Sequence, residues 1–163
     1  PKDQTGRFDD LKRRRTDILF PNVAWEAQGF TPKAEDSYAL VNSLRHCAVG
    51  INVASTISLE LCMFDKPVIN VAYNPTSVSE KEISYRSYYD FDHYKPVAAS
   101  GAVRLAKCER EMRELLRSSL ENPAAERSER KTLIAQMFGN TLDGKSSVRV
   151  ADTLLQLAGA KAG

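Results

Sequence analysis

The chain has 163 residues, of which 42% are hydrophobic and 27% are charged, and its formal net charge is +2. These values fit one soluble globular domain with a core of its own. Basic and acidic residues are interspersed, so nothing in the charge calls for nucleic acid or an anionic membrane as partner. No apolar run approaches the roughly 20 residues that span a bilayer, and we expect a cytoplasmic protein with no integral membrane segment.

The first half of the chain predicts alternating helices and strands. Apolar spacing and capping residues indicate the helices, and short apolar runs indicate the strands. A short apolar run of this kind, buried on both faces, is typical of a parallel sheet. In chain order we expect a helix at 6–15, a strand at 16–20, a helix at 32–46, a strand at 47–53, a helix at 57–64 and a strand at 68–73.

The second half begins with a stretch that has no clean period. Residues 74–100 are rich in tyrosine and polar side chains, which predicts a functional loop or a segment that covers a surface. A strand is expected at 101–106, followed by helices at 108–122, 124–138 and 146–158. The fold class is therefore α/β, with a Rossmann-like parallel sheet flanked by helices and a helical C-terminal region, in a single domain over residues 1–163.

Three cysteines, Cys47, Cys62 and Cys108, lie far apart in the chain and form no CxxC pair. An odd number of cysteines in apolar surroundings predicts reduced, buried thiols. We therefore expect neither a disulfide framework nor a zinc site.

The stretch INVASTISLE, residues 51–60, predicts an anion-binding site. Asn52 to Thr56 would lie at the carboxyl end of a parallel strand, where open α/β sheets bind their ligands. The next helix begins near Ser55 or Thr56, so its free backbone N–H groups and its dipole favour a phosphate there. Glu60 follows about one helical turn later, where a carboxylate can accept hydrogen bonds from a ribose diol.

A simpler interpretation explains the same residues without a ligand. Ser and Thr are ordinary N-cap residues, and either would stabilise a helix by about 1 kcal/mol. A Glu early in a helix also interacts favourably with the dipole. The glycines of a dinucleotide fingerprint or of a P-loop are absent from residues 51–60.

A longer stretch of the chain resembles a known family. AEDSYALVNSLRHCAVGINVASTISLELCMFDKPVINVAYN, residues 34–74, resembles the C-terminal, donor-nucleotide-binding half of GT-B glycosyltransferases. It is most similar to the surface-polysaccharide and CDP-glycerol glycerophosphotransferase-like groups. His46 and Cys47 stand where that pattern commonly has an Ala-Asp pair.

The resemblance extends to other segments and implies that the chain is a part of a larger fold. HYKPVAASGAVRLA, residues 93–106, and LDGKSSVRVADTLLQL, residues 142–157, look like later parts of the same half. The opening Pro-Lys-Asp resembles the tail of an element that follows the first strand of that half. We therefore expect a fragment that lacks this first strand and the N-terminal GT-B domain, which would be its partner.

The resemblance also implies roles for individual residues. Ser55 and Thr56 would contact the donor's phosphates, Glu60 would hold its ribose, and Asn52 belongs to the same nucleotide-binding set. His93 and Tyr94 look like a His-Tyr pair in a loop that faces the cleft, although His93 could equally be a surface residue beside a packing Tyr94.

The implied ligand is a nucleotide-diphosphate sugar or polyol, with UDP, CDP, GDP or a similar nucleotide, and no metal or other cofactor is required. In the intact enzyme an acceptor hydroxyl would attack the donor carbon next to the diphosphate, in surface-polysaccharide biosynthesis. No catalytic residue is assigned to this chain, which is expected to bind nucleotide weakly and to be inactive alone. The full-length protein would then be cytoplasmic, or peripheral at the inner face of the membrane. Two alternatives stay open, a nucleotide-sugar 2-epimerase-like half and a non-enzymatic flavodoxin-like interaction module.

Overall fold

The structure is a computed structural model of residues 1–163, and it describes residues 6, 8–21, 33–75 and 84–160. The chain divides into two compact units, residues 1–47 and residues 48–163. The single domain expected over residues 1–163 stays a prediction.

The first unit contains the two helices that the sequence predicts there, α1 (Asp9–Arg14) and α2 (Ala34–His46). The strand predicted at 16–20 is wrong. The chain turns there instead, because the Arg15 guanidinium donates to the Asp17 carboxylate at 2.8 and 2.6 Å and the Ile18 N–H donates to the Arg15 carbonyl at 3.4 Å. Leu19 is 89% exposed, and no described strand pairs with this segment. A short apolar run alone therefore does not make a strand without a neighbour to bond its backbone.

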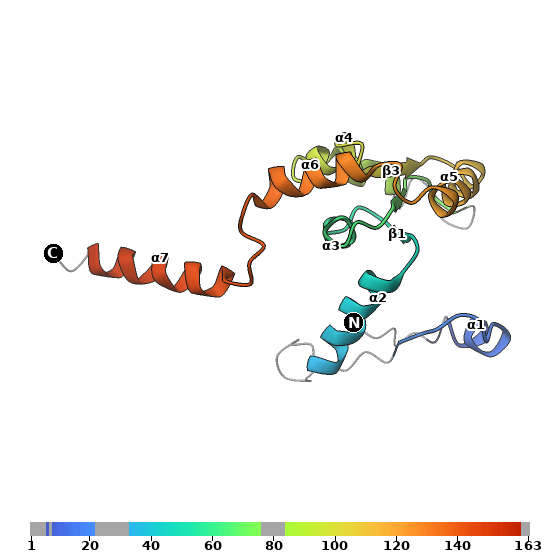
Figure 1. Ribbon diagram of the computed structural model, residues 1–163. Coiled ribbons are helices and arrows are strands. Elements are labelled where there is room, and N and C mark those ends of the chain that lie inside the picture. The colour runs from blue at the N-terminus through green and yellow to red at the C-terminus, as the bar shows by residue number, and fades with distance from the viewer. Residues whose placement is uncertain (1–5, 7, 22–32, 76–83, 161–163) are drawn as a thin grey trace. The chain divides into compact units, whose positions relative to one another are not determined.

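The second unit contains a three-stranded parallel sheet (Figure 1). Its strands are β1 (Gly50–Asn52), β2 (Val68–Val71) and β3 (Val103–Ala106), in the order β1-β2-β3. Gly50 pairs with Val68 and Asn52 with Asn70, so β1 and β2 end at the same edge of the sheet. The α/β class is confirmed, with a small parallel sheet flanked by helices.

Four described helices of the second unit lie where the sequence predicts them, α3 (Ile57–Met63), α5 (Glu109–Glu121), α6 (Arg127–Phe138) and α7 (Ser146–Ala160). The 3-10 helix η1 (Tyr85–Asp90) and the helix α4 (Lys95–Ala99) were not predicted. The short helices η1 and α4 lie in the stretch 74–100, which the sequence left without a period, and residues 76–83 of that stretch lie outside the described residues. None of the helices in the described ranges has the length and apolar character that a bilayer crossing requires.

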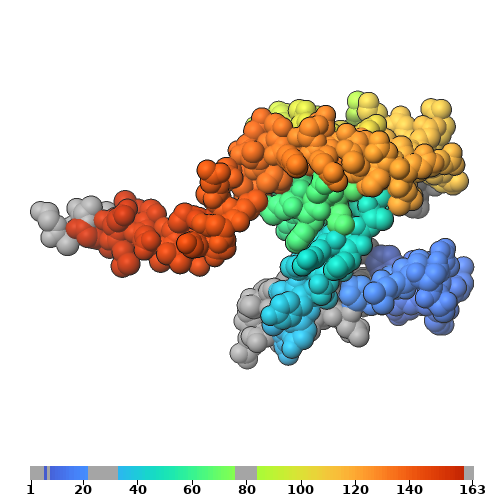
Figure 2. All heavy atoms as spheres, viewed as in Figure 1, coloured from blue at the N-terminus to red at the C-terminus, as the bar shows by residue number. Residues whose placement is uncertain are grey.

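The core of the second unit is built around β2, whose side chains are buried on both faces. Val68 is 1% exposed, and Ile69 and Asn70 are fully buried. On the face of Val68, α3 approaches β1 so closely that a Cβ atom added to Gly50 would lie 2.1 Å from Cδ1 of Leu61. The helix α6 packs in turn on α3, and in Figure 2 its orange atoms lie against the green atoms of the α3 segment.

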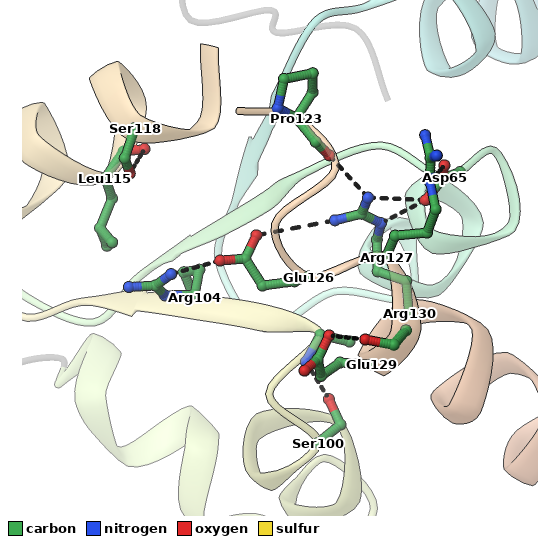
Figure 3. Close-up of polar contacts among 12 residues, drawn as sticks. Asp65, Ser100, Arg104, Leu115, Ser118, Pro123, Glu126, Arg127, Glu129 and Arg130 are labelled. Carbon is green, nitrogen blue, oxygen red and sulfur yellow. Dashed lines mark hydrogen bonds and ion pairs between the residues drawn. The ribbon is translucent and has the colours of Figure 1, made fainter. Parts of the chain in front are cut away.

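The turn after α3 is fixed by ionic contacts with α6 (Figure 3). Asp65 has a φ of 54°, and its carboxylate accepts hydrogen bonds from Arg130 at 2.8 and 2.9 Å and from Arg127 at 2.6 Å. The Arg130 side chain is fully buried and also donates to the Pro123 carbonyl at 2.9 Å. Burial by itself would raise the pKa of Asp65, but the hydrogen bonds from the two arginines outweigh it and lower the pKa below the ordinary 3.8. The C-terminal end of α3 is thus tied to α6.

The three cysteines are free, as the sequence predicts. Cys62, on α3, is buried, and this burial raises the pKa of its thiol to about 11. Cys47 and Cys108 are only half-buried, so the expectation of full burial holds for Cys62 alone.

Candidate functional site

The predicted site lies at the edge of the sheet where β1 and β2 end. Asn52 is the last residue of β1, and residues 53–56 form the loop that leads into α3. The partner of Asn52 across the sheet is Asn70 of β2. Because ligands of open α/β sheets bind outside the carboxyl ends of parallel strands, this edge is the place where the fold itself favours a ligand.

The loop satisfies several of its own backbone donors. The hydroxyl of Ser55 accepts a hydrogen bond from the Ile57 N–H at 3.3 Å, and the Ser58 N–H donates to the Ser55 carbonyl at 3.0 Å. Thr56 is the N-cap residue of α3, but its side chain makes no capping bond. The start of α3 therefore offers a ligand fewer free N–H groups than the sequence suggested, and Ser55 also has the helix-capping role that the simpler interpretation gave it.

The same loop contains a strained residue. Ala54 has a φ of 31°, which residues with a Cβ rarely adopt. Such strain costs on the order of 1–3 kcal/mol and persists where surrounding contacts enforce it, often at binding sites. Here Tyr89 supplies the contact, because its hydroxyl accepts from the Ala54 N–H at 3.4 Å and donates to the Val71 carbonyl at 2.7 Å.

Tyr89 keeps its proton at physiological pH. The side chain is only 6% exposed, and this burial raises the pKa of its hydroxyl to about 12. The neutral hydroxyl can therefore act at once as donor to the end of β2 and as acceptor from the loop. Tyr89 therefore links the loop at Ala54 to the end of β2 at Val71.

Beneath the loop lies a buried polar cluster, which consists of Asn52, Ser58, Asn70 and Tyr94. Ser58 and Asn70 are fully buried, and Tyr94 is 6% exposed. Asn70 Nδ2 donates to the Tyr94 hydroxyl at 2.6 Å, and the Tyr94 hydroxyl donates to Ser58 Oγ at 2.8 Å. Ser58 Oγ lies 3.1 Å from Asn52 Oδ1 and 3.2 Å from Asn70 Oδ1. The cluster therefore joins β1, β2, α3 and the start of α4 by side-chain hydrogen bonds.

One donor of this cluster has no partner. Asn52 Nδ2 is buried and makes no hydrogen bond to any described residue. Leaving a buried donor unsatisfied costs about 1–3 kcal/mol, so such groups are few in folded proteins and indicate a strained or functional place. The free donor and the strained Ala54 lie only two residues apart.

The structure brings some of the predicted residues together. Asn52 lies at the start of the loop, and Ser55 lies within it. Glu60 is on α3 and is half-buried, and its carboxylate has no ionic or hydrogen-bond partner among the described residues. Thr56 is exposed. The contacts of these residues with a nucleotide stay predictions.

The predicted His-Tyr pair is divided between surface and interior. His93 is exposed, and its ring stacks on Phe91 with centroids 5.8 Å apart. Tyr94 is buried, and its hydroxyl belongs to the polar cluster instead of lining an open surface. Of the two, only Tyr94 makes side-chain hydrogen bonds to the polar cluster beneath the loop in the described structure.

Three residues of the site escaped the sequence interpretation, namely Ser58, Asn70 and Tyr89. A signal existed for the first two, since each is a polar side chain between two apolar neighbours, Ser58 in ISL and Asn70 in INV. Buried polar side chains need partners, so two such interruptions in neighbouring elements indicate that they meet. Tyr89 had no comparable signal, because several tyrosines stand close together in residues 85–94.

The described residues contain no group of three or more His, Cys, Asp or Glu side chains placed to hold a metal ion. What the arrangement offers chemically is a set of neutral hydrogen-bond donors and acceptors with one unpaired carboxylate nearby, which suits binding and orientation of a polar ligand. Comparison with protein-family models, with curated proteins and with solved structures found no match to this chain.

Proposed function

We propose that this chain binds the nucleotide-diphosphate part of a sugar or polyol donor, as the donor-binding half of a GT-B glycosyltransferase. The proposal rests on the sequence resemblance of residues 34–74 and 93–106, together with the location of Asn52 and Ser55 at the carboxyl end of β1 and of Glu60 on the helix that follows. The α/β fold is compatible with it but is shared by many unrelated functions.

The observation that supports it most is the unsatisfied amide of Asn52 beside the strained Ala54. A phosphate oxygen is a strong acceptor, and it would give Asn52 Nδ2 the bond that the protein does not supply. The Ser55 hydroxyl lies in the same loop and could add a second donor.

Glu60 would serve the ribose of the same ligand. Its carboxylate is half-buried and unpaired within the described residues. An ionised carboxylate only accepts hydrogen bonds, so it matches the two hydroxyls of a ribose diol and would repel a phosphate. The donor's phosphates would then lie on the Asn52 side, with the ribose towards Glu60.

Calorimetric titration of the purified chain with UDP, CDP, GDP and ADP tests this function. We expect saturable binding of at least one of them. Asn52→Ala and Glu60→Ala should each weaken that binding about 10-fold, as expected when a hydrogen bond to a charged group is lost. Glu114→Ala, which removes an exposed carboxylate on α5, is the matched control and should leave the affinity unchanged.

Two results would contradict the proposal. One is the absence of saturable binding by all four nucleotides at millimolar concentration. The other is binding that neither site variant weakens, which would place the nucleotide elsewhere on the chain.

A further inference from the structure

The buried polar cluster contains a chain of hydrogen bonds that runs in one direction. Asn70 Nδ2 donates to Tyr94 and Tyr94 donates to Ser58, which leaves the proton of the Ser58 hydroxyl for an amide oxygen. Two amide oxygens lie within reach of this proton, Asn52 Oδ1 at 3.1 Å and Asn70 Oδ1 at 3.2 Å. The direction is set by proton count, because a hydroxyl has a single proton to donate.

Through the hydrogen bond between Ser58 and Asn52, this series of bonds reaches the residue with the free donor. The carboxamide group is planar, so a hydrogen bond to Asn52 Oδ1 also fixes the direction of Nδ2 on its other side. Accepting a bond at the oxygen also polarises the amide and makes its N–H groups stronger donors, as happens along cooperative hydrogen-bond chains. Full burial of Ser58 and Asn70 keeps water from competing for these bonds.

From this geometry we infer that Tyr94, Ser58 and Asn70 are positioning residues that hold the Asn52 amide towards a phosphate oxygen of the bound nucleotide. The inference rests on the proposed function, and it names the part of the ligand that the site recognises. Tyr94 acts here from the interior through Ser58 and not by touching the ligand.

Removal of the Tyr94 hydroxyl would interrupt the series of hydrogen bonds that runs from Asn70 through Tyr94 to Ser58. In Tyr94→Phe, Asn70 Nδ2 loses its acceptor, and the Ser58 hydroxyl no longer receives the bond that sends its own proton to an amide oxygen. The Ser58 hydroxyl can then give its proton to Asn70 Oδ1, 3.2 Å away, and the Asn52 side chain is free to rotate. The loss of one net hydrogen bond corresponds to an affinity about 3- to 10-fold weaker.

The test compares Tyr94→Phe with Tyr88→Phe in the full chain. Tyr88 lies in η1, and its hydroxyl makes no hydrogen bond to a described residue, so its variant removes the same atom without touching the cluster. Each protein is titrated by NMR with whichever of UDP, CDP, GDP and ADP binds the unmodified chain most tightly, and with the parent nucleoside. We expect Tyr94→Phe to weaken diphosphate binding about 3- to 10-fold and to leave nucleoside binding unchanged, and Tyr88→Phe to change neither.

A double-mutant cycle shows whether Tyr94 acts through Asn52. If it does, Tyr94→Phe has no further effect on diphosphate affinity once Asn52→Ala is present, because the group that it positions is gone. Ser58→Ala, a smaller change at a buried position, should behave as Tyr94→Phe does and replaces it if that variant fails to fold.

The possible results separate the inference from the proposed function. If no nucleotide binds the unmodified chain, both fail. If the nucleotide binds but Tyr94→Phe and Ser58→Ala bind it equally well, the positioning role alone is overturned. It is overturned as well if Tyr94→Phe weakens diphosphate and nucleoside binding by the same factor. It is also overturned if the double variant loses diphosphate affinity by the product of the two single factors, because Tyr94 would then act independently of Asn52.

Discussion

Gly50 is the residue at which the packing of α3 on the sheet is tightest. It stands on β1 opposite the buried Leu61, and an added Cβ would lie 2.1, 2.8 and 2.9 Å from three side-chain atoms of that leucine. Leu61 is only 2% exposed and has little room to withdraw. The absence of a side chain at Gly50 is therefore what lets α3 approach β1.

Gly50→Ala should accordingly destabilise the protein. We expect the free energy of unfolding to fall by about 1–3 kcal/mol, the usual cost of forcing an extra carbon into a packed core. Urea unfolding measures the change. Gly159→Ala is the control, because a Cβ there meets no atom within 4 Å and the position is helical, so the substitution should be neutral or stabilising by up to about 1 kcal/mol. Equal stability of Gly50→Ala and the unmodified chain would show that Leu61 and α3 move aside.

Among single residues, the sequence predicts which side chains follow β1, but it does not predict the hydrogen bonds that join them to other elements. The position of Asn52 and Ser55 followed from a strand, a turn and a helix in succession, which are local patterns. The bonds of Ser58, Asn70 and Tyr94 join residues up to 36 positions apart. Nothing in local periodicity reports such pairings, since they depend on which elements pack together.

Among the elements, α3 is short, with only seven residues, and is held in place at both ends. Its first turn is joined to the sheet through Ser58, and the turn after it is joined to α6 through Asp65. A helix of this length is marginal by itself, so its stability comes from such tertiary contacts. The geometry of the candidate site therefore depends on the Asp65 ion pairs at the far end of the helix.

The lowered pKa of Asp65 makes this contribution depend on pH. A carboxyl group with a pKa lower in the folded than in the unfolded state stabilises the fold fully above its unfolded pKa, about 3.9, and the effect disappears as the pH falls through the folded value. The depression comes from the hydrogen bonds of Arg130 and Arg127, which outweigh burial.

Asp65→Asn should therefore lower stability at neutral pH and matter less in acid. We expect a loss of about 1–3 kcal/mol at pH 7, because Asn accepts fewer and weaker bonds from the buried Arg130. The loss should shrink below about pH 4. Asn tolerates the positive φ of this turn, so the substitution isolates the charge.

Urea unfolding of both proteins between pH 7 and pH 3 checks this expectation. Asp92→Asn is the control, since Asp92 is 97% exposed and its surface ion pair with Lys95 should contribute little at any pH. A stability difference between Asp65→Asn and the unmodified chain that stays constant down to pH 3 would contradict the assigned role of the charge.

The sequence predicted the elements around Asp65 well and one element elsewhere wrongly. The strands of the second unit are each shorter than the apolar runs that predicted them, because pairing with a neighbour, and not apolar character, decides where a strand ends. The same reason explains the failure at residues 16–20, where Ile18 and Leu19 have no described strand beside them. Between residues 84 and 100, η1 and α4 are too short for a helical period to appear.

For the whole molecule, the division into two units separates most of the core from the first 47 residues. Of the described buried hydrophobic residues, only Leu44 belongs to the first unit. The sheet, the polar cluster and every residue of the candidate site belong to residues 48–163. The second unit therefore contains within itself the contacts that shape the site.

Residues 48–163 expressed alone should fold and should keep the binding properties of the full chain. We expect a cooperative urea transition, because a unit with its own hydrophobic core unfolds as a unit. Its affinity for the nucleotide that binds the full chain should lie within about 3-fold of the full chain's value, a difference under about 0.7 kcal/mol. Calorimetry and urea unfolding of the two proteins side by side give both quantities.

Asn52→Ala in the shorter protein is the internal control, since it should weaken binding by the same factor as in the full chain if the site is intact. A shorter protein that folds cooperatively but binds far more weakly would assign part of the ligand site to residues 1–47. One that fails to fold would show that the core around β2 needs the first unit to be stable, and the site would then depend on both units of the chain.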